Sequence, residues 1–158
     1  MITSNKDLFT QFPDQSKVWL YQSNKALTTA EIATLEEKLL TFVEGWAAHG
    51  NSLWATAKVL NPYFAVVAVN DTLVPPSGCS VDASIHRLKE IGEEMGINFF
   101  DRMNLTIHEG GELKQIHFSE LKNHTDALVF DPLITSLGEL RAAWPRPIEN
   151  SSFAHMVG

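Results

Sequence analysis

The stretch LWATAKVLNPYFAVVAV, residues 53–69, decides the fold. Its two halves have the composition of β-strands, and the Asn61-Pro62 pair between them is a turn signal, so we predict a β-hairpin of residues 53–60 and 63–69. In the first half, Thr56 and Lys58 face the same way, as in a half-exposed edge strand. The second half contains no polar residue, which is typical of a central strand with both faces buried.

A strand and a helix are predicted before this hairpin. The short apolar run Val18–Tyr21 is typical of another strand buried on both faces. Thr28 and Glu31 have the spacing of a capping box, in which each side chain bonds the other residue's backbone N–H. Apolar residues then recur at helical spacing as far as Trp46, and we expect the helix to end at Gly50.

A second helix and a second hairpin are predicted after it. The helix follows a Pro-rich loop (residues 71–78), has an apolar face from Val81 to Met95, and ends at Gly96. Residues 104–109 and 112–118 flank a Gly-Gly turn and form the second hairpin, in which His108 lies opposite Leu113. The remaining chain predicts only a helical turn near 119–122, a strand ending at residue 130 and a helix over 137–144.

The predicted order β-α-β-β-α-β indicates a ferredoxin-like α+β fold with strand order 4-1-3-2, because the two most apolar strands are then the central pair. We expect an added hairpin strand and an irregular C-terminal extension. One domain covers residues 1–158: an N-terminal arm (1–16), the ferredoxin-like core with its hairpin (17–118) and the extension (119–158).

The composition excludes several classes of protein. The net charge of −7 is unfavourable for binding nucleic acids or anionic membranes. The N-terminal residues lack the pattern of a signal peptide, and the most apolar run is too short to span a bilayer. A single cysteine cannot form an internal disulfide. We therefore expect a soluble cytoplasmic protein with no nucleic-acid or membrane partner.

The sequence SGCSVD, residues 77–82, contains this cysteine between a strand and a helix. A thiol before a helix is close to the positive end of the helix dipole, and the first N–H groups there could bind an anion. Cys79, Asp82 and His86 share one helical stripe. However, Cys79 and His86 would lie about 10 Å apart along the axis, and Asp82 would raise the thiol pKa, so we exclude a triad on this helix. The simplest interpretation of Cys79 is a small buried residue.

Two further positions are candidates for binding. Asp101 and Arg102 end the sequence FFDR between the second helix and the second hairpin, where the arginine could bind a carboxylate or a phosphate. A structural ion pair is the alternative. The spacing of the histidines does not suggest a metal site, and nucleotide-binding and G-x-S-x-G motifs are absent, so we predict no metal and no cofactor.

The segments VWLYQSN (18–24), SGCSVD (77–82), FFDR (99–102) and LVF (128–130) together resemble a small bacterial family without an assigned activity, often labelled "ABC transporter ATPase". The resemblance covers most of the chain, but not His86 or the C-terminal tail. It implies a site at Ser77, Gly78, Cys79, Ser80 and Asp82, and less specifically at Asp101 and Arg102. The label itself is wrong for this chain, which lacks the lysine-containing phosphate loop of such ATPases.

Three functions are consistent with these observations. We favour a non-catalytic domain that binds a small ligand or a protein through the turn of residues 77–82. The first alternative is a thiol-dependent enzyme or redox sensor that uses Cys79, with a base such as His108 or His124 supplied by the fold. The second is an assembly module that forms a homodimer through an exposed edge strand.

Overall fold

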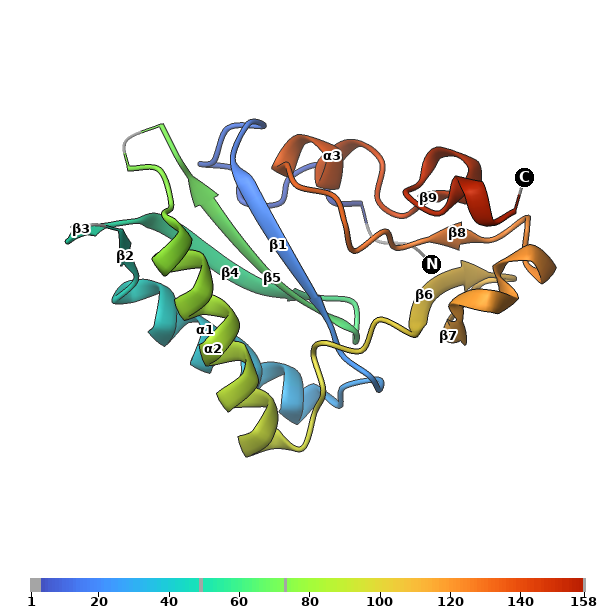
Figure 1. Cartoon of the computed structure of the whole chain (residues 1–158), viewed down its shortest axis with the longest axis horizontal. Coiled ribbons are helices and arrows are strands. Elements are labelled where there is room, and N and C mark those ends of the chain that lie inside the picture. The colour runs from blue at the N-terminus through green and yellow to red at the C-terminus, as the bar shows by residue number, and fades with distance from the viewer. Residues whose placement is uncertain (1–3, 49, 73, 158) are drawn as a thin grey trace.

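The computed structural model describes residues 4–48, 50–72 and 74–157. It is an α+β structure in which two larger sheets lie beside each other (Figure 1). The first sheet consists of β1 (Lys17–Gln22), β5 (Phe64–Asn70) and β4 (Trp54–Leu60), in that order. The second sheet has the order β7 (Glu112–His117), β6 (Asn104–Glu109), β8 (Leu128–Val129) and β9 (Arg146–Pro147). The prediction of an α+β fold is confirmed.

The first sheet contains the predicted hairpin. β4 and β5 pair antiparallel, with Leu60 opposite Phe64 across the turn, and β5 pairs antiparallel with β1 on its other side. All seven residues of β5 are buried, as expected for an uninterrupted apolar strand in the centre of a sheet. The predicted order of strands one, three and two within the sheet is therefore correct.

The predicted position of the fourth strand is wrong. β6 does not pair with β1; it pairs antiparallel with β7 and β8 in the second sheet. The two sheets are joined instead by the side chain of Gln22, at the end of β1. Its Nε2 donates to the carbonyl of Asn104 (2.8 Å), and its Oε1 accepts from the N–H (3.1 Å) and hydroxyl (2.9 Å) of Thr106. The chain thus crosses the end of β1 and continues into another sheet.

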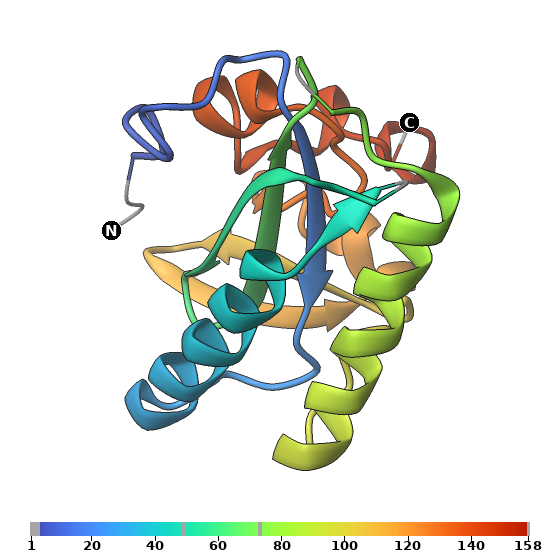
Figure 2. The same ribbon diagram turned by 90° about the vertical axis from the view of Figure 1, so that its left-hand side faces the viewer.

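Two long helices, α1 (Thr29–Glu44) and α2 (Gly78–Met95), cover one face of the first sheet (Figure 2). The predicted capping box of Thr28 and Glu31 is present. The predicted end of α1 is wrong, because Gly45 caps the helix. Trp46 lies outside it, and Gly50 forms the turn between the short strands β2 (Ala47–Ala48) and β3 (Asn51–Ser52). α2 ends at Gly96, as predicted.

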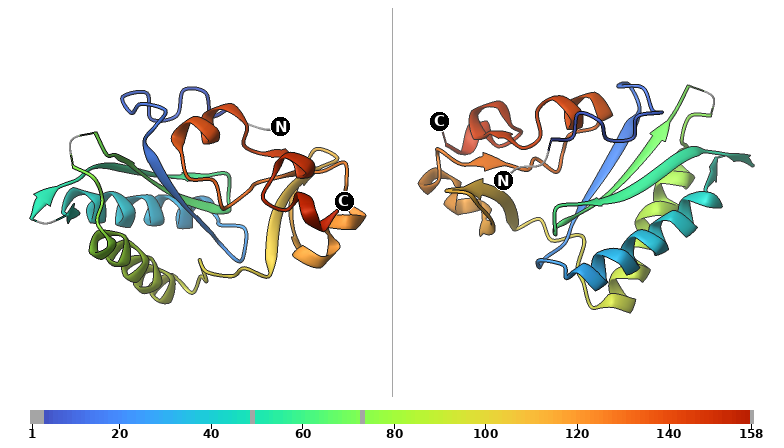
Figure 3. Two further views of the ribbon diagram at one scale, coloured as in Figure 1. Left: turned by 45° about the horizontal axis from the view of Figure 1, so that its top comes forward. Right: turned by 180° about the vertical axis from the view of Figure 1, so that it is seen from behind.

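The opposite face of the first sheet is covered by the N-terminal arm and by the chain after β8, including α3 (Leu137–Ala142) (Figure 3). Phe12 of the arm packs there with Phe130 and Trp144. Shorter 3-10 helices span Phe118–Asn123, Ile148–Asn150 and Ala154–Met156. Two separate apolar clusters therefore lie on the two faces of the first sheet, and a third belongs to the second sheet.

Candidate functional site

The turn of residues 77–82 forms the cap of α2. The Ser77 hydroxyl accepts from the Ser80 N–H (3.1 Å), and the Ser80 hydroxyl accepts from the Ser77 N–H (2.7 Å). The indole N–H of Trp46 donates to the Ser80 carbonyl (2.7 Å). Both serines thus have a structural role in starting the helix and holding it against the segment after α1.

The other members of this turn are exposed to solvent. Gly78, Cys79 and Asp82 all lie on the surface, so the interpretation of Cys79 as a buried residue is wrong. In residues 4–48, 50–72 and 74–157, no group of three His, Cys, Asp or Glu side chains could hold a metal ion. No side chain in the described part of the chain makes a hydrogen bond or an ion pair with the Cys79 thiol.

Asp101 and Arg102 lie in the loop that connects α2 to β6, and their roles differ. The Asp101 carboxylate accepts from the N–H of Met103 and from the side-chain amide of Asn104, both at 2.8 Å. Asp101 is thus engaged within its own loop. Arg102 is exposed and makes neither a hydrogen bond nor an ion pair with the described residues. The guanidinium N–H groups of Arg102 are therefore without an acceptor among the described residues.

A cleft of about 440 Å³ opens beside β1, and Asp101 and Arg102 are among its lining residues. β1 forms one side of it, the loop of residues 99–105 a second, and Pro132, Leu133 and Phe153 a third. Of the two long helices, only α2 contributes, through Ile85. The structure thus brings Asp101 and Arg102 to a cleft and places the turn of residues 77–82 outside it. We call this site the β1 cleft.

The outer edge of β1 lies in the β1 cleft and is only partly paired. At the N-terminal end of β1, the N–H of Val18 donates to the Thr135 carbonyl (3.0 Å), and the Ser16 carbonyl accepts from the N–H of Leu137 (2.9 Å). Backbone groups in a strand alternate sides, so those of Leu20 also face away from β5. In the described part of the chain, no further segment pairs with Leu20. This edge is the one that a fourth ferredoxin-like strand would cover.

Tyr21 lines the β1 cleft, but its hydroxyl is not a candidate general base. Its hydroxyl and that of Ser84 are 3.1 Å apart. Burial raises the pKa of Tyr21 above its ordinary value of 10.0, while the hydrogen bond to Ser84 acts weakly in the other direction. The phenol is therefore protonated at neutral pH, and it holds β1 against α2.

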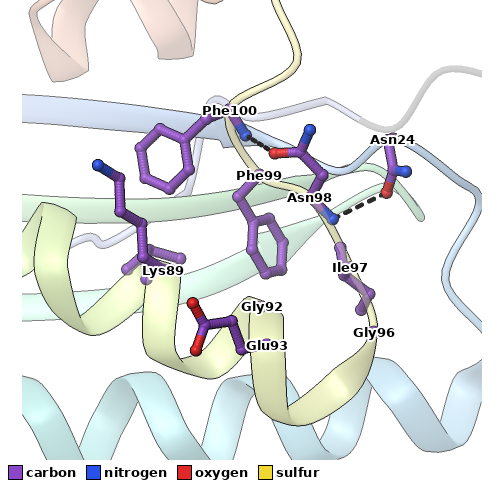
Figure 4. A pocket seen from close by; sticks show the side chains of 10 residues that line it. Asn24, Lys89, Gly92, Glu93, Gly96, Ile97, Asn98, Phe99 and Phe100 are labelled. Atoms are coloured by element: carbon purple, nitrogen blue, oxygen red, sulfur yellow. Dashed lines mark hydrogen bonds between the residues drawn. The ribbon is translucent and has the colours of Figure 1, made fainter.

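A second hollow, of about 480 Å³, lies between the end of α2 and residues 96–100 (Figure 4). Asn24 and Asn98 order this segment, since each side-chain carbonyl accepts a backbone N–H, at 3.0 and 2.8 Å respectively. The ammonium of Lys89 lies 5.6 Å from the centre of the Phe100 ring. Phe99 and Phe100 line both this hollow and the β1 cleft, so they form the wall between them.

Sequence patterns alone do not indicate most of the residues of the β1 cleft. Trp19, Leu20, Phe100, Leu133 and Phe153 line it but were predicted only as parts of strands, loops or the tail. One signal was available: Gln22 follows an apolar strand that was predicted to be central, and a polar side chain there indicates a different neighbour.

Comparison of the chain with known protein families, with curated protein sequences and with solved structures finds no match in any of the three.

Proposed function

We propose that this protein is a non-catalytic binding domain whose β1 cleft receives an amphipathic ligand with an apolar body and an anionic group. The observation that carries the proposal is the position of Arg102, an exposed guanidinium at a largely apolar cleft that has no partner among the described residues. The volume of about 440 Å³ is within the range of small-ligand sites, which is about 300–1,000 Å³. A guanidinium bonds a carboxylate or phosphate through two parallel N–H groups.

Other features bear on the cellular location and on the fold of the protein. None of the helices in the described ranges is long and apolar enough to cross a membrane. A free, exposed thiol at Cys79 is in keeping with a reducing compartment, so we place the protein in the bacterial cytoplasm. We also propose that β1, α1, β4, β5 and α2 are a ferredoxin-like unit whose fourth strand is displaced into the second sheet.

The proposal can be tested by titrating the isotopically labelled protein with octanoate and following its backbone amide signals by NMR. We expect the signals of the β1 cleft to shift, because the alkyl chain binds the apolar wall and the carboxylate binds Arg102. Octanamide, which has the same shape without the charge, should shift them much less. Shifts confined to other surfaces, or equal shifts with both compounds, would contradict the proposal.

Two variants make the test specific. Arg102→Gln should weaken octanoate binding about tenfold or more, because a charge-assisted hydrogen bond is lost. Lys89→Gln is the matched control, because Lys89 contacts Phe100 from the second hollow and does not line the β1 cleft. It should leave octanoate binding unchanged.

A further inference from the structure

We propose that the natural occupant of the β1 cleft is an extended peptide segment of a partner protein, which adds a strand to the outer edge of β1 and places a carboxylate on Arg102. This inference rests on the proposed function, since it names the class of ligand that the cleft binds. Three observations carry it: the unpaired backbone of β1, the exposed apolar side chains beside the cleft, and the distribution of charge.

The backbone of β1 supplies the first observation. Leu20 presents an N–H and a carbonyl to the cleft, and the carbonyl of Val18 faces the same way by strand alternation. Contacts with residues 135–137 cover only the first end of this edge. An extended chain about 4.8 Å from β1 would pair with these groups, whereas a compact small molecule pairs with few of them.

The side chains around the cleft supply the second observation. Leu133, which lines the cleft, is 60% exposed, and Met103, between two lining residues, is 52% exposed. These are the most exposed large apolar side chains among those the structure describes. Leu133 thus adds an exposed apolar surface to the apolar lining of the cleft, and contiguous apolar surface of this kind is typical of a binding site.

The charges supply the third observation. Asp101 keeps its negative charge, but both of its carboxylate oxygens are bonded within its own loop and no ion pair joins it to Arg102, so the guanidinium N–H groups are left for another acceptor. The chain as a whole carries a net charge of −7, and Arg102 is the cationic side chain among the lining residues of the β1 cleft. The complementary group on the partner is an acidic side chain or a C-terminal carboxylate.

A second copy of the chain is a poorer occupant. The edge of β1 lies between the wall of residues 99–105 and the wall that contains Leu133 and Phe153. A single extended strand fits between such walls. The β1 edge of another folded copy has the same walls on both sides, so two such edges would collide before they could pair.

The proposal is tested with a positional library of hexapeptides, made with free and with amidated C-termini, and binding is measured with the intact protein. We expect the peptides that bind to contain alternating apolar residues and a carboxylate. For the best of them, N-methylation of the one residue that faces Leu20 should weaken binding about tenfold or more, because a hydrogen-bond donor is lost. If the peptide with the free C-terminus binds more tightly than its amide, the group that contacts Arg102 is the terminal carboxylate. If the two bind equally, it is an acidic side chain.

Two protein variants test the same contact. Leu20→Pro removes the N–H without removing a bond to β5, and proline is tolerated where this group does not pair. Leu20→Ala removes the same side chain and keeps the N–H. We expect Leu20→Pro to weaken peptide binding about tenfold relative to Leu20→Ala. The methylated peptides bind the wild-type protein, so the test holds even if Leu20→Pro does not fold.

The outcomes separate this inference from the proposed function. If octanoate binds but no peptide binds more tightly, or if methylation has no effect at any position, the peptide proposal is wrong and the proposed function stands. If neither octanoate nor any peptide binds, both are wrong. A dimer in sedimentation experiments that Leu20→Pro abolishes would show that a second copy occupies the edge, which also overturns the proposal.

Discussion

Cys79 lies on the first turn of α2, exposed to solvent, and the hydroxyls of Ser77 and Ser80 beside it bond within the same turn. These contacts give the serines a structural role, whereas the thiol has no bonding partner among the described residues. Helix capping and the bond from Trp46 are thus the roles that the structure shows for this turn.

We predict that Cys79 reacts completely with iodoacetamide in the folded protein, because its side chain is accessible. Mass spectrometry of the native and the urea-unfolded protein measures the extent of labelling. Cys79→Ser should leave octanoate binding unchanged, since the turn lies outside the β1 cleft. Labelling that requires unfolding, or a loss of binding in this variant, would contradict the assignment.

Gly92 shows how one position holds an element in place. A Cβ at this residue would lie 2.4 Å from the Ile97 carbonyl oxygen and 3.5 Å from the Phe99 ring. The segment that forms the wall between the two hollows therefore packs directly on the backbone of α2. Only glycine permits this approach.

We predict that Gly92→Ala lowers the free energy of unfolding by about 1–3 kcal/mol, because the overpacking outweighs the gain in helix propensity of about 1 kcal/mol. Gly78→Ala is the matched control in the same helix. A Cβ there has no atom within 4 Å, so its stability should be unchanged or slightly raised. Chemical denaturation measures both, and equal effects of the two changes would refute the packing argument.

At the scale of elements, Glu109 connects the β6–β7 hairpin to His124, the residue that caps the following 3-10 helix. Glu109 accepts from Lys114 Nζ (2.9 Å), and its carboxylate lies 2.9 Å from Nδ1 of His124. The hydrogen bond from Lys114, and next that from His124, hold the pKa of Glu109 below its ordinary value of 4.5.

The sign of the pH effect follows from this direction. A carboxyl group whose pKa is lower in the folded state stabilises the fold above its unfolded pKa, and this contribution is lost as the pH falls through the folded pKa. We predict that wild-type stability falls more steeply below pH 4.5 than that of Glu109→Gln. Urea denaturation at a series of pH values measures the difference, and parallel curves would contradict the prediction.

At the scale of the whole molecule, the two sheets depend on a buried polar contact. Gln22 bonds Asn104 and Thr106 of β6, and Gln115 of β7 donates to the Ser23 carbonyl (2.7 Å). Gln22 and Thr106 are both buried, so no water replaces these bonds if one partner is removed.

We predict that Gln22→Leu lowers the free energy of unfolding by at least about 2 kcal/mol, because the N–H of Thr106 and the carbonyl of Asn104 lose their partner in the interior. Gln15→Leu is the control, since Gln15 is exposed and should change stability by less than about 0.5 kcal/mol. Similar effects of the two substitutions in chemical denaturation would show that the contact does not join the sheets.

The sequence was sufficient for the local elements and for part of the topology. The capping box at Thr28, the hairpin around Asn61-Pro62 and the register of His108 opposite Leu113 all follow from short-range patterns, and all three are confirmed. Each depends on residues close in sequence, where spacing determines which groups meet.

The position of β6 could not be predicted in the same way. Its sequence pattern does not specify which strand it pairs with, and its observed position involves contacts between distant segments, such as Gln22 with Thr106. The β1 cleft exists because β6 leaves that edge. The wrong prediction for β6 and the failure to predict the β1 cleft therefore have the same cause, which is the position of β6 in the second sheet.

The central claim is that the outer edge of β1 is open in the free protein and accepts a partner strand. Amide hydrogen exchange of Leu20, followed by NMR with and without the best hexapeptide, tests it most directly. We predict fast exchange in the free protein and strong protection in the complex, while Tyr21, whose backbone faces β5, is protected in both. Protection of Leu20 in the free protein, or its unchanged exchange when peptide is bound, would contradict the account.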